Sequence, residues 1–216
     1  MTGRHADFIR RETAIASPPL IPELRLHLAT EITPIWRATE AELAREGVDP
    51  PYWAFAWPGG QALARHLLDT PGLVAGKRVL DFAAGSGLTA IAAARAGGRV
   101  EANDIDPVAA AAIGLNAALN HVVLDVSTDD LVGSDCRWDI VLAGDICYEQ
   151  PMAAHVFPWL QRCAADGALV LMGDPGRAYL PDDGLERVAL YEVPTSLELE
   201  DRTLRPTTIW RILPPA

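Results

Sequence analysis

The stretch V-L-D-F-A-A-G-S-G, residues 79–87, decides the fold that we expect for this chain. An apolar run ends at Asp81, a turn of small residues follows, and an alanine-rich stretch over 88–96 has the composition of a helix. The next strand-like run, 99–103, is followed directly by Asp104. A strand, a glycine turn, a helix and an acid that closes the next strand are typical of a parallel α/β sheet that binds a ribonucleoside ligand.

The same alternation of strand and helix continues to the end of the chain. Strand-like runs are expected at 78–82, 99–103, 121–126, 138–143, 168–172, 187–193 and 207–213. The first five are separated by helical segments at 88–96, 107–120 and 151–165 and by a loop at 127–137, and the last two are joined by a polar connection at 194–205. This pattern predicts a Rossmann-like, doubly wound α/β fold with a seven-stranded sheet and an antiparallel final strand.

The first 75 residues are expected to form a helical extension of the same domain. Short helices are predicted at 5–16, 22–30 and 39–46, and a further helix at about 61–68. No low-complexity linker separates two domains. We therefore expect a single domain, in which residues 1–75 contribute to the substrate and cofactor site and residues 76–216 form the core.

The composition limits the classes of function. The chain has 216 residues and a formal net charge of −11, and such a field repels phosphate backbones, so we expect no nucleic-acid partner. The three cysteines lack C-x-x-C spacing and the five histidines are scattered, which predicts a reduced protein without a metal site. No apolar run is long enough to span a membrane and no export signal is recognisable, so we expect a cytoplasmic protein.

The glycine turn is compatible with two kinds of cofactor. Residues 85–90 also fit the dinucleotide pattern G-x-G-x-x-A, but Asp81 would repel a pyrophosphate at the start of the helix. The same carboxylate suits a ligand that carries an ammonium and a sulfonium, and S-adenosylmethionine is such a ligand. Asp104 can accept hydrogen bonds from both ribose hydroxyls. The alternative is that both acids only cap the turns that follow them.

Two further residues are candidates for the cofactor site. Asp129, in the loop after the third strand, stands where an adenine amino group would lie. Trp57 precedes Pro58-Gly59-Gly60, and its indole could lie along the cofactor and exclude water. An alternative remains open, in which Trp53, Phe55 and Trp57 form one face of a buried strand.

The segment after the fourth strand, Gly144-Asp145-Ile146-Cys147-Tyr148-Glu149, holds the candidate catalytic residues. At the carboxyl edge of the sheet it would face the methyl donor. We expect Asp145 to accept hydrogen bonds from a lysine ε-ammonium and Tyr148 to narrow the slot around the lysine stem. Methyl transfer is an in-line displacement that depends mainly on proximity, so no dedicated base is expected. Alternatively, these two residues are a strand-end turn and a core aromatic.

Three motifs make the chain resemble a known family. They are D-P-P-Y-W-A-F-A-W-P-G-G-Q-A-L at 49–63, N-D-I-D-P at 103–107 with Asn116 and Asn120 downstream, and G-D-I-C-Y-E at 144–149. From about residue 20 onward the sequence resembles the seven-β-strand class I methyltransferases. More narrowly, it resembles the electron transfer flavoprotein β-subunit lysine methyltransferase family.

The resemblance implies an enzyme that uses S-adenosylmethionine to add up to three methyl groups to lysines of the electron transfer flavoprotein β-subunit. It also implies two sets of site residues: Asp81, Gly85, Gly87 and Asp104 at the cofactor with Trp57 close by, and Asp145 and Tyr148 at the lysine entry. Ala83 departs from the family pattern, which usually has a glycine there. A methyl group should be tolerable if that position keeps a negative φ, and we expect an active enzyme.

Other functions differ in the acceptor or in the class of protein. Within methyl transfer, the acceptor could be a lysine of another bacterial protein, such as a ribosomal protein, or a small amine. The glycine pattern also permits an NAD-dependent oxidoreductase, which Asp81 and the lack of a Ser-Tyr-Lys or His-based hydride site disfavour. A cofactor-binding module without catalysis would keep Asp81 and Asp104 but would not need Asp145 and Tyr148.

Overall fold

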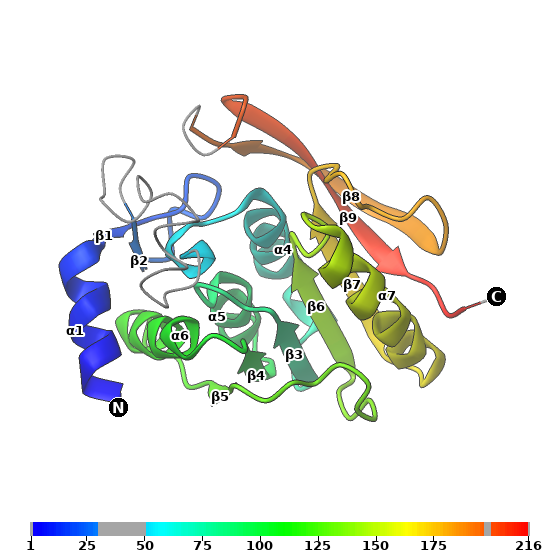
Figure 1. Ribbon diagram of the computed structural model, residues 1–216, viewed down its shortest axis with the longest axis horizontal. Coiled ribbons are helices and arrows are strands. Elements are labelled where there is room, and N and C mark those ends of the chain that lie inside the picture. The colour runs from blue at the N-terminus through cyan, green and yellow to red at the C-terminus, as the bar shows by residue number, and fades with distance from the viewer. Residues whose placement is uncertain (1, 30–50, 197–199, 216) are drawn as a thin grey trace.

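The computed structural model describes residues 2–29, 51–196 and 200–215, and its centre is a seven-stranded sheet (Figure 1). The order of the strands is β5-β4-β3-β6-β7-β9-β8. Their bounds are β3 (Arg78–Phe82), β4 (Arg99–Asn103), β5 (Asp125–Ser127), β6 (Ile140–Gly144), β7 (Leu169–Asp174), β8 (Leu185–Pro194) and β9 (Leu204–Ile212). The strands from β5 to β7 run parallel, and β9 inserts antiparallel between β7 and β8. The predicted doubly wound sheet with an antiparallel final strand is confirmed.

Helices cover both faces of this sheet and bury alternate residues of its strands. The bounds are α4 (Pro58–Asp69), α5 (Leu88–Arg95), α6 (Pro107–Leu119) and α7 (Gln150–Ala165). Val79 of β3 packs in the apolar core beneath α4, α5 and α6, whereas Leu80 and Phe82 pack on the opposite face against α7. Successive side chains of a strand point to opposite faces of the sheet, and here helices bury both faces.

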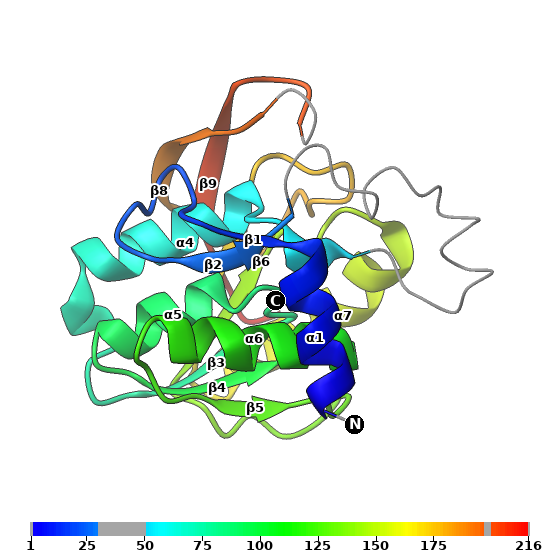
Figure 2. The ribbon, with the colours of Figure 1, turned by 90° about the vertical axis from the view of Figure 1, so that its left-hand side faces the viewer.

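The N-terminal region differs from its prediction. Helix α1 (Thr2–Glu12) packs against α6 (Figure 2), which confirms part of the helix expected at 5–16. It is followed by strand β1 (Ala14–Ala16), which pairs antiparallel with β2 (Leu26–Leu28). The helix expected at 22–30 is therefore wrong, and the one expected at 39–46 lies outside the described residues.

The reason for the strand β2 lies in α6. The side chain of Asn116 accepts a hydrogen bond from the backbone N–H of His27 at 2.7 Å. Asn120 accepts from the N–H of Arg25 at 3.0 Å and donates to its carbonyl oxygen at 2.6 Å. These contacts span about ninety residues of sequence, so the local helical tendency is outweighed by partners that a local pattern does not reveal.

The third strand of the chain's core is also shorter than expected. The prediction covered 121–126, but β5 contains only Asp125–Ser127. His121 has a φ of +57° and donates its N–H to the carbonyl of Ala118, so the turn that ends α6 occupies the first residues of the predicted strand.

The N-terminus of α4 lies directly on the carboxyl ends of β6 and β7. A Cβ atom on Gly59 would collide with the carbonyl oxygen of Gly173, and one on Gly144 would lie 3.0 Å from the backbone nitrogen of Gly60. Only glycines permit this approach of backbone to backbone. Pro58, at the first helical position, has no N–H that needs a partner. The Pro-Gly-Gly sequence therefore sets how closely α4 sits on the sheet.

This packing predicts opposite effects of the same change at adjacent glycines. Gly59→Ala should lower the free energy of unfolding by about 2–3 kcal/mol, because backbone atoms would have to move apart. At Gly60 the nearest atom to an added Cβ is Thr89 Oγ1 at 3.7 Å, an ordinary contact. Gly60→Ala should therefore be neutral or stabilise by up to about 1 kcal/mol through helix propensity. Urea unfolding of both variants measures this, and equal destabilisation would contradict the account.

Candidate active site

Asp81 is a buried acid beneath the glycine turn. It lies within β3, with Phe82 as the last residue of the strand, and its side chain is 2 % exposed. Its Oδ2 accepts a hydrogen bond of 2.8 Å from the N–H of Ala90, in the first turn of α5. Burial raises the pKa of Asp81 to about 7, against the effect of that hydrogen bond, and the charge of Asp104 raises it further. Asp81 is thus poised to respond to a positive charge placed beside it.

The glycine turn requires left-handed backbone at three positions. Gly85 and Gly87 have φ values of +52° and +76°, and Gly87 caps α5. A Cβ on Gly87 would also lie 3.2 Å from the side chain of Ile113. Ala83 has a φ of +52° as well, so the negative φ on which tolerance of its methyl group depended is not present. Its methyl group is held in a conformation that costs an L-residue about 1–2 kcal/mol.

Asp104 joins the same turn from the next strand. Its Oδ2 accepts the N–H of Gly85 at 2.8 Å and its Oδ1 accepts the N–H of Asp106 at 3.0 Å. Burial raises the pKa of this carboxyl, and the two backbone hydrogen bonds oppose that rise. Since a carboxylate offers about four lone-pair sites, two acceptor positions are still available to a ligand.

The Asp129 loop is anchored to the end of β4 through its backbone. Asn103 donates its side-chain amide to the carbonyl oxygen of Asp129 at 2.9 Å, and the N–H of Asp104 donates to Ser127 at 3.2 Å. The carboxylate of Asp129 itself is exposed. The loop therefore lies beside Asp104, and the role of the Asp129 side chain stays a prediction.

The rings of Trp57, Tyr52 and Tyr148 lie next to one another. The indole N–H of Trp57 donates to the carbonyl oxygen of Tyr52 at 2.8 Å. The ring of Tyr52 lies 6.0 Å from that of Trp57 and 5.2 Å from that of Tyr148. Residues Tyr52–Ala54 form a 3-10 helix, so the alternative of a buried strand through Trp53, Phe55 and Trp57 is wrong.

Tyr148 is 38 % exposed, which separates it from the core. Burial of the rest of the ring raises the pKa of its phenol to about 12, and the nearby charges of Glu149 and Asp104 contribute. The phenol is therefore protonated near neutral pH and can donate a hydrogen bond. Through its contact with Tyr52, Tyr148 lies in the same aromatic group as Trp57.

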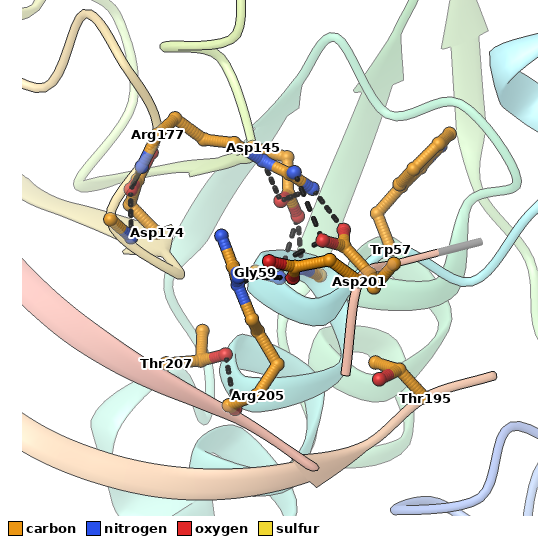
Figure 3. Close-up of polar contacts among 12 residues, drawn as sticks. Trp57, Gly59, Asp145, Asp174, Arg177, Thr195, Asp201, Arg205 and Thr207 are labelled. Carbon is orange, nitrogen blue, oxygen red and sulfur yellow. Dashed lines mark hydrogen bonds and ion pairs between the residues drawn. The ribbon is translucent and has the colours of Figure 1, made fainter. Parts of the chain in front are cut away.

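Asp145 is buried, and its carboxylate accepts four hydrogen bonds (Figure 3). Oδ2 accepts the N–H groups of Gly59 at 2.6 Å and Gly60 at 3.3 Å. Oδ1 accepts two from Arg177, from Nε at 3.1 Å and from Nη2 at 2.8 Å. A lysine ammonium would thus share an acceptor that is already fully engaged.

The backbone and the proton affinity of Asp145 are also perturbed. Its φ of +53° is an unusual value for a residue with a side chain, though aspartate tolerates it better than most. Burial raises the pKa of Asp145 to about 6, against the lowering effect of Arg177 and with a further rise from the charge of Asp174.

Three residues of this site were missed from the sequence: Arg177, Asp174 and Glu200. Arg177 forms a second ion pair with Glu200 at 2.7 Å, and its guanidinium lies 5.6 Å from the centre of the Trp57 ring. Asp174 Oδ1 accepts the N–H groups of Gly176 and Arg177, both at 2.7 Å. A signal was present in the sequence, because a Gly-Asp pair stands at the end of both strands: Gly173-Asp174 closes β7, and Gly144 closes β6 with Asp145 directly after it.

Other kinds of site are not found in the parts of the chain that the structure describes. Over residues 2–29, 51–196 and 200–215 no group of three or more histidine, cysteine or acidic side chains could hold a metal ion. Within the same ranges, no helix has the length and apolar character to cross a membrane. Cys136, Cys147 and Cys163 are free thiols.

Comparison with known proteins agrees with this geometry. The family model described as "Ribosomal protein L11 methyltransferase (PrmA)" matches residues 63–176. A magnesium protoporphyrin IX methyltransferase from Synechocystis, solved with bound SAM, superposes with a TM-score of 0.54 at 19 % identity, over 71 % of this chain and 79 % of that one. A ribosomal protein L11 methylase from Lactobacillus delbrueckii gives 0.52 at 21 % identity, over 77 % and 84 %. The chain therefore has the fold of the S-adenosylmethionine-dependent methyltransferases.

Curated relatives narrow the class to one family. The electron transfer flavoprotein β-subunit lysine methyltransferase of Danio rerio is 42 % identical over 97 % of this chain and 85 % of its own length. The protein of the same name from Homo sapiens is 37 % identical over 96 % and 81 %. The chain belongs to the electron transfer flavoprotein β-subunit lysine methyltransferase family.

The strained Ala83 gives a direct test of the turn. Ala83→Gly should raise the free energy of unfolding by about 0.5–1 kcal/mol, because relief of the left-handed strain exceeds the extra backbone entropy of glycine in the unfolded chain. Ala83→Val should lower it, since a β-branched side chain fits a positive φ poorly. Denaturant titration measures both, and a destabilised glycine variant would contradict the claim that left-handed strain at Ala83 is released by glycine.

Proposed function

We propose that this protein transfers methyl groups from S-adenosylmethionine to lysine side chains of the electron transfer flavoprotein β-subunit. The acceptor is the one in the names of relatives that match nearly the whole chain. The proposed setting for the reaction is the cytoplasm, which the three free thiols support because reduced cysteines are typical of that compartment.

One observation carries the choice of cofactor: carboxylates already accept one N–H group of the glycine turn and one of the first turn of α5. Asp81 accepts from Ala90 at the start of α5, and Asp104 accepts from Gly85. A dinucleotide would place its pyrophosphate against those same N–H groups, and the two acids would repel it. A sulfonium and an ammonium reverse the sign of that interaction. This favours S-adenosylmethionine over NAD.

The proposed placement follows from the three strand ends. The methionine part of the cofactor would lie at the Gly85–Gly87 turn, with its positive charges near Asp81. The ribose would bind the two acceptor positions left on Asp104, and the adenine would extend toward the Asp129 loop. Trp57, whose indole is fixed by its hydrogen bond to Tyr52, would cover the reacting end from water.

The acceptor lysine would enter past Tyr148. Its aliphatic stem can pack on the exposed face of Tyr148, next to Tyr52. Asp145, which is held in place by its hydrogen bonds from Arg177 and α4, would orient the amine. In-line displacement at the methyl carbon needs alignment more than acid–base chemistry. Desolvation and the nearby sulfonium both favour the neutral, nucleophilic amine.

The raised pKa of Asp81 predicts a pH dependence of cofactor binding. Below a pH of about 7 the acid is increasingly protonated, and a cationic ligand must displace that proton. The dissociation constant for S-adenosylmethionine should therefore rise by up to about tenfold per pH unit as the pH falls from 7 to 5. Asp81→Asn should bind weakly with little pH dependence over this range. Calorimetry decides, and a wild-type affinity that is constant between pH 5 and 7.5 would contradict the role of Asp81.

The acceptor assignment is tested by mass spectrometry after incubation with labelled S-adenosylmethionine and purified electron transfer flavoprotein. We expect methylated lysines in its β-subunit. Tyr148→Ala should lower the rate about tenfold or more with cofactor affinity within a few-fold, while Tyr148→Phe, which keeps the ring, should lose less. Val123→Ala, at a side chain that is 91 % exposed and outside the site, serves as the control.

Two results would overturn this assignment. If ribosomal protein L11 is labelled and the flavoprotein is not, the acceptor is the one in the description of the matching family model. Equal loss of cofactor affinity and rate in Tyr148→Ala would make Tyr148 part of the cofactor site.

A further inference from the structure

Arg177 connects the candidate acceptor site to the β8–β9 connection. Its Nε and Nη2 donate to Asp145 Oδ1, at 3.1 Å and 2.8 Å. Nη2 also donates to Glu200 Oε1 at 2.7 Å, and Nη1 donates to Glu200 Oε2 at 3.4 Å. All three side chains are largely buried, with exposed fractions of 16 %, 8 % and 5 % for Arg177, Asp145 and Glu200. Figure 3 shows Arg177 and Asp145 in contact above Gly59, with Trp57 on one side.

We propose that Arg177 is a positioning residue for methyl transfer, which holds the Asp145 carboxylate in its charged form and in one orientation and ties it to Glu200. The proposal rests on the proposed function and deepens it, because it names the group that prepares the acceptor side of the site.

An arginine fits this geometry better than a lysine does, although either would supply the positive charge. The planar fork of a guanidinium can serve two carboxylates at fixed angles, whereas a lysine ammonium is a single point charge that would approach one of them closely. The residue's own backbone is fixed too, since its N–H donates to Asp174 Oδ1 at 2.7 Å. Trp57 limits the movement of the guanidinium on another side.

The charges around Asp145 come from several elements. The N–H groups of Gly59 and Gly60 face it from α4, Cys147 lies after β6, and Asp174 and Arg177 face it from the end of β7 and the following loop. Glu200 reaches it through Arg177. Arg205 of β9 lies near Glu200, at 3.8 Å, and near enough to Asp174 to lower its pKa.

Without Arg177 the cluster around Asp145 would contain three acidic side chains and one basic side chain. They are Asp145, Asp174 and Glu200, and Arg205. Asp145 would then gain a proton, because burial already raises its pKa to about 6 with Arg177 present. If it stayed ionised instead, the unpaired charge would hold an arriving lysine as ammonium, which cannot attack the methyl carbon. Either event slows methyl transfer at neutral pH. Higher pH removes the proton from Asp145 in the first case and from the lysine ammonium in the second, so the rate should recover in both.

The test compares four variants by two readouts. Arg177→Gln removes the charge, Arg177→Lys keeps it, and Glu200→Gln removes the competing acid. Arg78→Gln is the matched control, because Arg78 pairs with Asp139 at 2.8 Å just before β6, at the far end of the strand that Asp145 follows. The readouts are the pH profile of kcat and the titration of the Asp145 carboxyl carbon by NMR, assigned with Asp145→Asn.

For Arg177→Gln we expect the acidic limb of kcat and the Asp145 midpoint to move up by at least about one pH unit. The rate at pH 7 should fall about tenfold or more and recover at pH 9, with cofactor affinity within about threefold. In Arg177→Lys the limb should stay near its wild-type position. Glu200→Gln should shift it toward lower pH, and Arg78→Gln should leave it in place.

An unchanged Asp145 midpoint in Arg177→Gln would overturn the proposal, and so would a loss of rate that is equal at every pH in both Arg177 variants. If Arg177→Gln does not fold, the opposite shift in Glu200→Gln and the retained limb in Arg177→Lys decide the matter. The NMR titration needs no acceptor protein. A wild type that titrates as expected but methylates no flavoprotein would refute the proposed substrate and leave the role of Arg177 intact.

Discussion

The hydrogen bonds to the Asp145 carboxylate hold the site together. They join the N-terminus of α4, the end of β6 and the loop after β7 at one point. The close approach of Gly59 to Gly173 makes them possible, since any side chain at Gly59 would push α4 away from the sheet. Trp57, immediately before this helix, is placed by the same contact. In the proposed site, Trp57 beside the cofactor and Asp145 beside the acceptor lysine therefore depend on the same contact between α4 and the sheet.

A second constraint is the number of acids in poorly solvated positions. Burial raises the pKa of Asp81, Asp104, Asp145 and Asp174 alike. Such groups reduce the stability of a folded protein unless hydrogen bonds or opposite charges compensate them. The positive charge of Arg177 compensates Asp145 and Asp174. Among the described residues, the hydrogen-bond partners of Asp81 and Asp104 are backbone N–H groups, and a cationic ligand would complete the compensation.

Much of this could be predicted from the sequence, because the central strands and their closing acids are local patterns. Runs such as 78–82 and 99–103 match β3 and β4 residue for residue. The remainder depended on partners far away in the chain. Strand β2 exists through Asn116 and Asn120, and Arg177 meets Asp145 across 32 residues. The positive φ of Ala83 belongs to the turn as a whole, and no property of alanine indicates it.

Everything proposed here depends on aspartates at the ends of β3 and β4 binding a cationic nucleoside cofactor. A crystal structure with S-adenosylhomocysteine, the demethylated product, tests this claim most directly. We predict electron density across the Gly85–Gly87 turn, with both ribose hydroxyls within hydrogen-bonding distance of Asp104. Density elsewhere on the molecule, or a ribose that makes no contact with Asp104, would contradict the account.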